Sequence, residues 1–178
     1  GVVFMLKTDL ARELVRTDDK KIDQRIARTD LRLDERLSKK TGKPAGRYIT
    51  IESDIVTKGD IALFPRLCRA LSEAVKTLAE GKSRALAVGL GNRLLTADAL
   101  GTLTVDKLAV ENNRGDVVMR TLAPSVVGIT GIESYDVIRG VAEVVKPDVV
   151  FAIDSLCAAK VGRIGTSFQL SDAGITPG

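Results

Sequence analysis

The sequence predicts an α/β fold built on an open, twisted and mainly parallel sheet with helices on both faces. Two observations predict it. From residue 84 onward, short apolar runs alternate with segments of helical periodicity, and the runs lack the polar alternation of strands that face water. At 178 residues and 44% hydrophobic content, the chain is also long enough to bury one sizeable core. We therefore expect a single domain, residues 1–178, with a crossover helix between neighbouring strands.

The N-terminal third of the chain gives two elements. Residues 42–46 have the glycine and proline content of a turn, and a strand over Tyr48–Glu52 is expected after it because its isoleucines alternate with polar residues. Apolar residues at three- and four-residue intervals predict an amphipathic helix over Ile61–Leu78. Residues 9–40 fit either helix or strand, and both assignments stay open.

The C-terminal part of the chain carries the regular alternation. The expected elements are a strand over Arg84–Leu90, a helix over Ala99–Val110, a strand over Val117–Ala123, a helix over Glu133–Val145 and a strand over Val149–Ile153. Thr166–Leu170 is expected to add a further strand. Because crossovers between parallel strands are right-handed, the C-terminal ends of these strands lie along one sheet edge, where open α/β folds place their ligands.

Two aspartates fall on that edge. Asp98 follows the run that ends at Leu90, and Asp154 directly follows the apolar run Val149–Ile153. The chain contains no histidine, so carboxylates are the best candidates for acid–base chemistry. If the two carboxyl groups face each other, repulsion and partial burial keep one protonated while the other ionises. The pair can then activate water and polarise a carbonyl group.

Each aspartate also has a structural interpretation. Asp98 fits a cap on the helix that follows it as well as it fits catalysis, and Asp154 fits a cap on the segment from Ser155 onward. A metal bridged by the two carboxylates is the competing use of the pair. It is disfavoured because histidine is absent and the sequence offers no evident third acidic ligand. We expect neither a metal nor another cofactor.

The glycine-rich segment at residues 89–92, Gly-Leu-Gly-Asn, has two interpretations. Glycines let backbone amides approach a pyrophosphate, which favours nucleotide binding, but the third glycine of the dinucleotide motif is missing at the required spacing. In a hydrolase, the backbone amides of Gly91 and Asn92 are instead candidates for supporting the substrate or its oxyanion.

Composition argues against several function classes. The cysteines, Cys68 and Cys157, are too few for a disulfide framework, and Cys157 as a nucleophile lacks a histidine base. The net charge of +4 comes mainly from residues 7–47, but acids are interspersed there and aromatics make up 3% of the chain, so we expect no direct nucleic-acid site. No apolar run is long enough to span a bilayer, and no secretory signal is evident. We expect a soluble, unexported protein without membrane contact.

Several ordered segments carry a resemblance to a known family. They are Thr8–Ala11, Gly42–Glu52, Asn92–Gly101, Ala123–Glu133, Asp148–Asp154 and Ser171–Gly178. Together they are similar to the germination protease (spore protease) of endospore-forming bacteria, and the similarity spans nearly the whole chain.

The resemblance implies an atypical aspartic endopeptidase that opens the degradation of small acid-soluble spore proteins during germination. It also implies a cytoplasmic location in the spore core or forespore, synthesis as a zymogen that trims its own N-terminus, and a homotetramer. The family's two essential aspartates fall on Asp98 and Asp154. The implied fold resembles that of hydrogenase-maturation proteases (phosphorylase/hydrolase-like), whose metal site uses a histidine ligand that this chain lacks.

The chain departs from the family pattern at several positions. Ala97 and Thr102 replace usual prolines, Ser125 a usual glycine, Ser155 a usual alanine and Thr176 a usual histidine. The family also continues well past residue 178, so we expect an N-terminal portion of a longer family-type chain. The competing hypothesis is a non-catalytic, sporulation-associated relative or an inactive zymogen-like fragment that binds a protein partner.

Overall fold

The computed structural model describes residues 9–15, 19–108 and 117–175. The chain divides into two compact units. The antiparallel unit comprises Gly1–Leu78 together with Leu156–Gly174, and the parallel unit comprises Ala79–Ser155 together with Ile175–Gly178. Each is named after the sheet that it contains.

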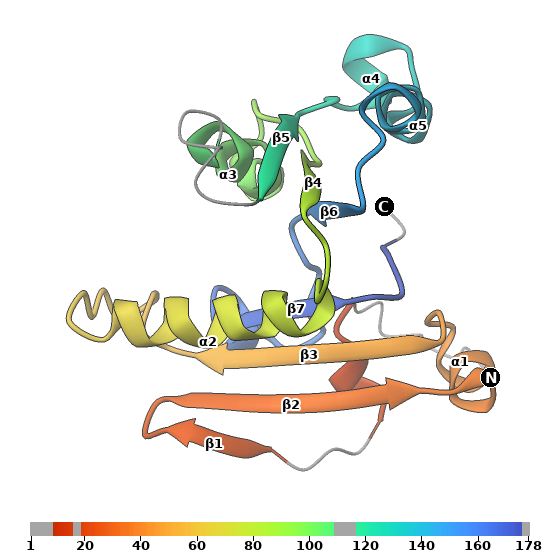
Figure 1. The fold of residues 1–178 in the computed structure, drawn as a ribbon. Coiled ribbons are helices and arrows are strands. Elements are labelled where there is room, and N and C mark those ends of the chain that lie inside the picture. Colours follow the sequence, from red (N-terminus) through yellow and green to blue (C-terminus); the bar gives the residue numbers. More distant parts are fainter. Residues whose placement is uncertain (1–8, 16–18, 109–116, 176–178) are drawn as a thin grey trace, which may run out of the picture. The chain divides into compact units, whose positions relative to one another are not determined.

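The antiparallel unit is built on a sheet with the strand order β1-β2-β3-β7, in which every neighbouring pair is antiparallel. Its elements are β1 (Lys20–Asp23), β2 (Ile26–Leu33), α1 (Glu35–Thr41), β3 (Gly46–Ser53), α2 (Phe64–Leu78) and β7 (Ser167–Ser171), with single helical turns at Ala11–Glu13 and Val161–Arg163. Figure 1 shows α2 lying along β3. Asp34 begins α1 by accepting the backbone N–H of Leu37 at 2.8 Å, and Gly42 ends it in the left-handed conformation.

The core of the antiparallel unit lies between α2 and one face of its sheet. Leu67, Ala70 and Ala74 of α2 are buried against Ile49 and Ile51 of β3. This packing confirms the helix predicted from apolar spacing, although α2 begins at Phe64 rather than at residue 61. The other face of the sheet is also partly buried. It buries Thr29 and Thr50 and carries a smaller apolar cluster around Tyr48.

The parallel unit is built on a sheet with the strand order β5-β4-β6, in which both neighbouring pairs are parallel. Its elements are β4 (Arg84–Gly89), a helical turn at Thr96–Asp98, α3 (Leu100–Leu108), β5 (Val118–Leu122), α4 (Val127–Thr130), α5 (Ser134–Val145) and β6 (Val149–Ile153). The chain leaves β4, passes through α3 to β5 on one side, and returns through α5 to β6 on the other side. In Figure 1, β4 lies between its two partners.

The central strand β4 is buried on both faces, with a different residue size on each. Leu86, Val88 and Leu90 pack against Ile138 and Val141 of α5. Successive side chains of a strand point to opposite faces, so the alternating small residues Ala85, Ala87 and Gly89 face the other way. A Cβ at Gly89 would lie 2.7 Å from the Val105 side chain of α3. The parallel sheet therefore has helices on both faces, as predicted.

The prediction of one mainly parallel sheet was wrong for the first part of the chain. The expected strand at Thr166–Leu170 exists as β7, but it pairs antiparallel with β3 instead of extending the parallel sheet. Residues 9–40, which were left open, contain β1, β2 and α1. The strands expected at Tyr48–Glu52, Arg84–Leu90, Val117–Ala123 and Val149–Ile153 and the helix at Glu133–Val145 are confirmed within a few residues. The predicted helix from Ala99 begins at Leu100, and its expected end at residues 109–110 lies outside the described residues.

Among the described residues, no helix combines the length and the apolar character needed to cross a bilayer.

Candidate active site

The candidate site lies at the C-terminal ends of β4 and β6, which are neighbours in the parallel sheet. The connection after β4 runs to β5 on one side, whereas β6 pairs with β4 on the other side. Adjacent strands whose connections diverge leave a crevice between the following loops, and open α/β folds bind their ligands there. Both predicted aspartates belong to these two loops.

Asp98 is held by the loop that directly follows β4. It ends the helical turn Thr96–Asp98 and is half-buried. Its carboxylate oxygen Oδ2 accepts the backbone N–H of Asn92, with 2.6 Å between N and O. The side-chain oxygen of Asn92 in turn accepts the backbone N–H of Leu94 at 2.9 Å. The Asp98 carboxylate thus closes a loop of seven residues by a charge-assisted hydrogen bond.

Gly91 makes this arrangement possible. Its φ of +99° is in the region that favours glycine. A Cβ at Gly91 would collide with the carbonyl oxygen of Asp98 and would lie 2.8 Å from the Asp98 carboxylate oxygen Oδ1. Any side chain at position 91 would therefore displace Asp98.

Asp154 is the first residue after β6 and is also half-buried. The carbonyl of Ile153 accepts the backbone N–H of Leu90 at 2.9 Å, which ties this strand end to the start of the Asp98 loop. The Asp154 oxygen Oδ1 accepts the backbone N–H of Ser155 at 2.8 Å. Asp154 therefore begins the chain segment beside the one that Asp98 closes.

Gly101, at the start of α3, brings the two segments together. A Cβ at Gly101 would collide with the Ile153 carbonyl oxygen and would lie 2.5 Å and 2.7 Å from the carbonyl oxygen and the nitrogen of Leu90. The helix backbone thus lies directly against both strand ends. Gly101 follows Asp98 by three residues in the sequence, and the Ile153 backbone that it contacts immediately precedes Asp154. The sequence alone did not indicate this role for Gly101. Its signal was a glycine inside a segment of helical pattern, which often marks close backbone packing.

The structure bears on the alternatives to catalysis. The hydrogen bond that the Asp98 side chain makes joins it to the loop before it, not to the first turn of α3. The segment after Asp154 is not helical until Val161, so a helix cap does not explain that residue. Within residues 9–15, 19–108 and 117–175, no group of three or more histidine, cysteine or acidic side chains is placed to hold a metal ion.

The glycine-rich loop has internal partners as well. Gly89 packs against α3 and Gly91 against Asp98, so both glycines are explained by contacts within the protein rather than by a nucleotide. The backbone N–H of Asn92 donates to Asp98 and is therefore not directed at a substrate oxyanion.

Cys157 belongs to the antiparallel unit and is exposed. The backbone N–H of Cys157 donates to the Asp9 carboxylate, and the Cys157 carbonyl accepts the backbone N–H of Asp9.

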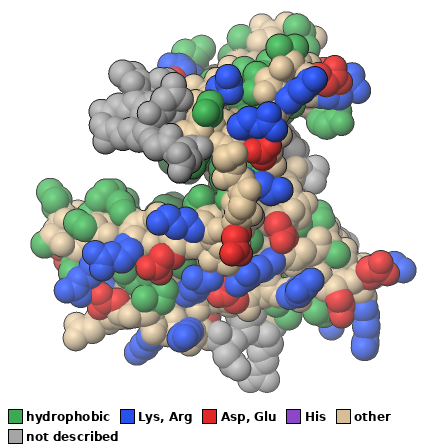
Figure 2. Space-filling model, viewed as in Figure 1, with side chains coloured by type: hydrophobic (Ala, Val, Ile, Leu, Met, Phe, Trp, Pro, Cys, Tyr) green, Lys and Arg blue, Asp and Glu red, His purple; other side chains and the backbone are tan. Residues whose placement is uncertain are grey.

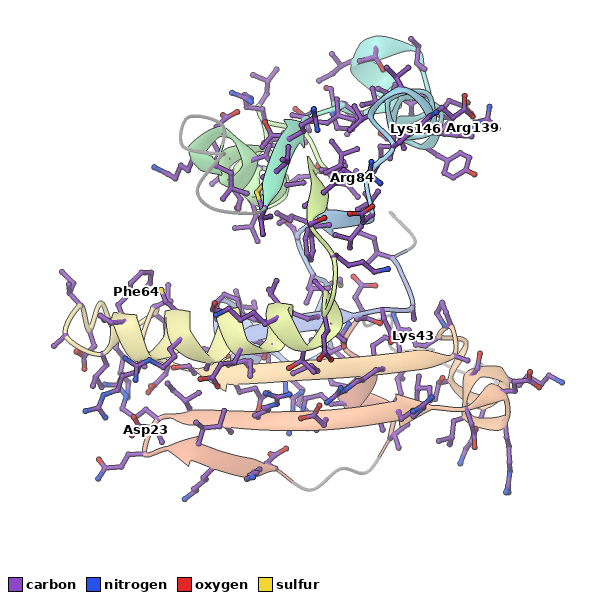
Figure 3. The ribbon with its side chains drawn as sticks, in the orientation of Figure 1. Asp23, Lys43, Phe64, Arg84, Arg139 and Lys146 are labelled. Atoms are coloured by element: carbon purple, nitrogen blue, oxygen red, sulfur yellow. The ribbon has the colours of Figure 1, made fainter. Side chains whose placement is uncertain are left out.

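At the opposite end of the same strands, Asp148 forms a clamp. Its carboxylate accepts hydrogen bonds from the Arg84 guanidinium, at 2.7 Å for the shorter one, and from the backbone N–H of Arg84 at 2.9 Å. The hydrogen bond from the Arg84 guanidinium has the larger effect and the one from the Arg84 backbone N–H the smaller, and together they hold the pKa of Asp148 far below its usual value. Figure 3 labels Arg84 at the beginning of β4. This clamp fixes the register of β6 beside β4, and Asp154 lies at the other end of β6.

Comparison with known proteins identifies the family. A sequence profile described as germination protease matches residues 7–178. The chain belongs to the germination protease family. Among its relatives, the germination protease of Caldanaerobacter subterraneus subsp. tengcongensis is 39% identical over 149 residues, which cover 77% of this chain and 46% of that protein. The germination protease of Bacillus subtilis is 38% identical over 152 residues, which cover 77% of this chain and 41% of that protein.

A germination protease of Clostridium perfringens is similar at 35% identity over 149 residues, again with 77% of this chain and 46% of the relative covered. The chain thus spans less than half the length of these curated germination proteases.

Two departures from the germination protease pattern have a visible structural role. Ser125, at a position where glycine is usual, adopts a φ of +68°, in the region that favours glycine. Its carbonyl accepts the hydroxyl of Ser134 at 2.8 Å, which connects the loop after β5 to the start of α5. Thr102, at a usual proline, is buried, and its hydroxyl donates to the Ala99 carbonyl at 2.9 Å inside the first turn of α3. The departure at Thr176 lies outside the described residues.

Proposed function

We propose that this chain is part of an atypical aspartic endopeptidase that initiates the degradation of small acid-soluble spore proteins during germination. One observation carries the proposal. Two half-buried aspartates follow neighbouring parallel strands, and the backbones of their segments meet at Leu90. Membership of the germination protease family supports proteolysis as the reaction.

In the proposed mechanism, Asp98 and Asp154 share the acid and base roles. The ionised carboxylate takes a proton from water as the water oxygen attacks the peptide carbonyl carbon, and the protonated carboxyl polarises the carbonyl oxygen. The C–N bond then breaks, and the leaving nitrogen takes a proton from the carboxyl group that received it. Gly91 and Asn92 are assigned the orientation of Asp98, in place of the oxyanion role expected from the sequence.

Further properties belong to the same proposal. They are the synthesis of the protein as a zymogen that trims its own N-terminus, assembly as a homotetramer, and a place in the cytoplasm of the spore. The hydrogenase-maturation-protease-like fold and the single domain also stay predictions. The three-stranded parallel sheet with helices on both faces is compatible with the former.

The test uses the full-length protein with a purified small acid-soluble spore protein, and mass spectrometry of the products. Asp98→Asn and Asp154→Asn are each expected to slow cleavage by at least about 10³-fold, because loss of a general acid or base removes about 10²–10⁴ in rate and each aspartate has two successive tasks. Asp136→Asn is the matched control, since Asp136 is an exposed aspartate of α5 that holds neither strand end of the site. It is expected to cleave at the parental rate at temperatures where it stays folded.

Two results would contradict the proposal. If Asp98→Asn and Asp154→Asn cleave as the parent does, the aspartates are not catalytic. If the parent leaves the spore protein intact but copurifies with it, the protein is the non-catalytic binder of the competing hypothesis.

A further inference from the structure

The antiparallel unit contains an open groove of about 670 Å³, which is within the range of about 300–1,000 Å³ that is typical of ligand sites. We call it the hairpin groove because the turn between β1 and β2 forms one of its walls. Its other wall is the segment 160–166, and the end of β3 contributes the floor. Its lining residues are Lys21, Asp23, Gln24, Arg25, Ile26, Ala27, Glu52, Ser53, Asp54, Lys160, Gly162, Arg163 and Thr166. Asp23, at the hairpin end, is labelled in Figure 3.

Every acid that lines the hairpin groove is already paired with a cation. Asp23 pairs with Arg66 at 2.7 Å. Asp54 pairs with Arg25 at 2.7 Å and with Lys58 at 2.6 Å. Glu52 pairs with Arg163 at 3.4 Å and with Arg12. These pairs use both lining arginines as well, so neither the acids nor the arginines leave an uncompensated charge in the groove.

Two lysines of the groove are different. Lys21 on β1 and Lys160 on the opposite wall are exposed, and neither has a carboxylate partner in the described part of the chain. The groove therefore offers two uncompensated positive charges, one on each wall. On the face shown in Figure 2, basic and acidic side chains are interspersed over this unit. Whether a given charge has an ion-pair partner is therefore more informative than the number of charges.

We propose that the hairpin groove is an exosite that binds an acidic, extended segment of the protein substrate. The inference rests on the proposed function, because it assigns the groove to the substrate of the same enzyme. The two lysines complement side-chain carboxylates, while the exposed side-chain amide of Gln24 offers a donor and an acceptor to a peptide backbone. The paired carboxylates in the walls and the lack of an aromatic residue in the lining disfavour a polyphosphate chain with stacked bases.

The chain offers a matched control for Lys21. Lys20 precedes it on β1 and is also exposed. In the strand register, Lys20 lies opposite Arg28 of β2, whereas Lys21 lies opposite Ala27. Neighbouring residues of a strand point to opposite faces of the sheet, and Lys20 does not line the groove. Lys20→Glu therefore changes the net charge of the protein by the same amount without changing the groove.

The binding experiment uses full-length protein carrying Asp98→Asn, so that the probe is not cleaved. The probe is a fluorescent ten-residue peptide with four glutamates, and a peptide with glutamines in their place is the control. Lys21→Glu with Lys160→Glu is expected to raise Kd for the acidic peptide about tenfold at low salt, because each exposed charge pair contributes modestly and reversal turns attraction into repulsion. Lys20→Glu with Lys39→Glu, an exposed lysine of α1 that also lies outside the groove, changes the net charge by as much as the double reversal and is expected to leave Kd within about twofold of the parent.

The kinetic experiment uses the active full-length protein and a spore protein substrate. The double reversal is expected to raise KM about tenfold with kcat unchanged, because the groove contributes binding that is equal in the ground state and the transition state. If the double reversal leaves KM and the peptide Kd at parental values while cleavage proceeds, the exosite is refuted and the protease function stands.

The remaining outcomes separate the exosite from the function. If the acidic peptide binds and the double reversal weakens it, but the active protein cleaves no spore protein, the groove is confirmed as an acidic-peptide site and the proposed function fails. If a single-stranded oligonucleotide displaces the peptide at lower concentration than the unlabelled acidic peptide does, the groove is a nucleic-acid site and the exosite is refuted.

Discussion

The two ends of the parallel sheet hold aspartates in opposite ways. At the N-terminal end of its strands, Asp148 is bound by the Arg84 guanidinium, which keeps the pKa of that carboxyl far below its usual value. At the C-terminal end, Asp98 is bound by the backbone N–H of Asn92, and no cation of the described residues pairs with it. A carboxylate neutralised by arginine acts as a structural clamp. Asp98, which is held by a neutral backbone group, is the carboxylate to which we assign acid–base chemistry in the proposed mechanism.

Among substitutions at the two ends of the parallel sheet, Gly101→Ala at the C-terminal end is expected to lower the free energy of unfolding most. The new Cβ would collide with the backbone of Ile153 and Leu90, which cannot move as a flexible side chain can. Unfolding of the full-length variant in urea is expected to show a loss of about 3 kcal/mol or more. Gly140→Ala in α5 is the matched control, because nothing lies within 4 Å of its Cβ, and it is expected to gain about 0.5–1 kcal/mol. Equal stability of the two variants would contradict the close packing at Gly101.

A smaller effect, dependent on pH, is expected from Asp148→Asn. Because the folded-state pKa of Asp148 lies below its unfolded value of about 3.9, its contribution to stability is fully present above pH 4 and is lost as the pH falls through the folded pKa. The variant is therefore expected to unfold at lower urea concentration than the parent at pH 7, and the difference is expected to shrink as the pH falls below 4. A difference that is constant from pH 7 to pH 2 would show that the clamp does not depend on the charge of Asp148.

The smallest effect is expected from Ser125→Gly in the loop after β5. At φ +68°, serine is strained where glycine is not, whereas glycine loses more conformational entropy on folding. The balance is expected to raise the free energy of unfolding by about 0.5–1 kcal/mol, as measured in urea. Ser134, whose hydroxyl binds the Ser125 carbonyl, is left unchanged. A decrease in stability would mean that the Ser125 side chain makes a contact that outweighs the strain.

The elements that the sequence predicted well are those whose signal is local. The apolar spacing of α2 and α5 and the apolar run of β4 each follow from a period within one segment. The antiparallel sheet was missed because its signal is not local. β2 carries Arg28, Asp30 and Arg32 on one face, where two of them pair with each other, and this charge hides the strand pattern. β7 joins β3 from more than a hundred residues away, and no local pattern indicates which sheet a strand enters.

For the site, the sequence named the two aspartates but not the way they are held. Their positions followed from the absence of histidine and from the ends of two apolar runs. The role of Asn92 changed because the backbone N–H that was expected to face an oxyanion is used by Asp98. Gly101 was missed because close packing between a helix and two strand ends exists only after the chain has folded.

The sequence by itself determined which residues are available for chemistry, the strands and helices of the parallel unit, and the family to which the chain belongs. Only the tertiary structure showed that Asp148 is a clamp and how the two candidate catalytic aspartates are held. The physical reason is that the behaviour of a carboxyl group depends on its neighbours. Arg84 lies beside Asp148 in space although 64 positions separate them in sequence, and the same strand pairing carries Asp154 to the end of the sheet where Asp98 lies.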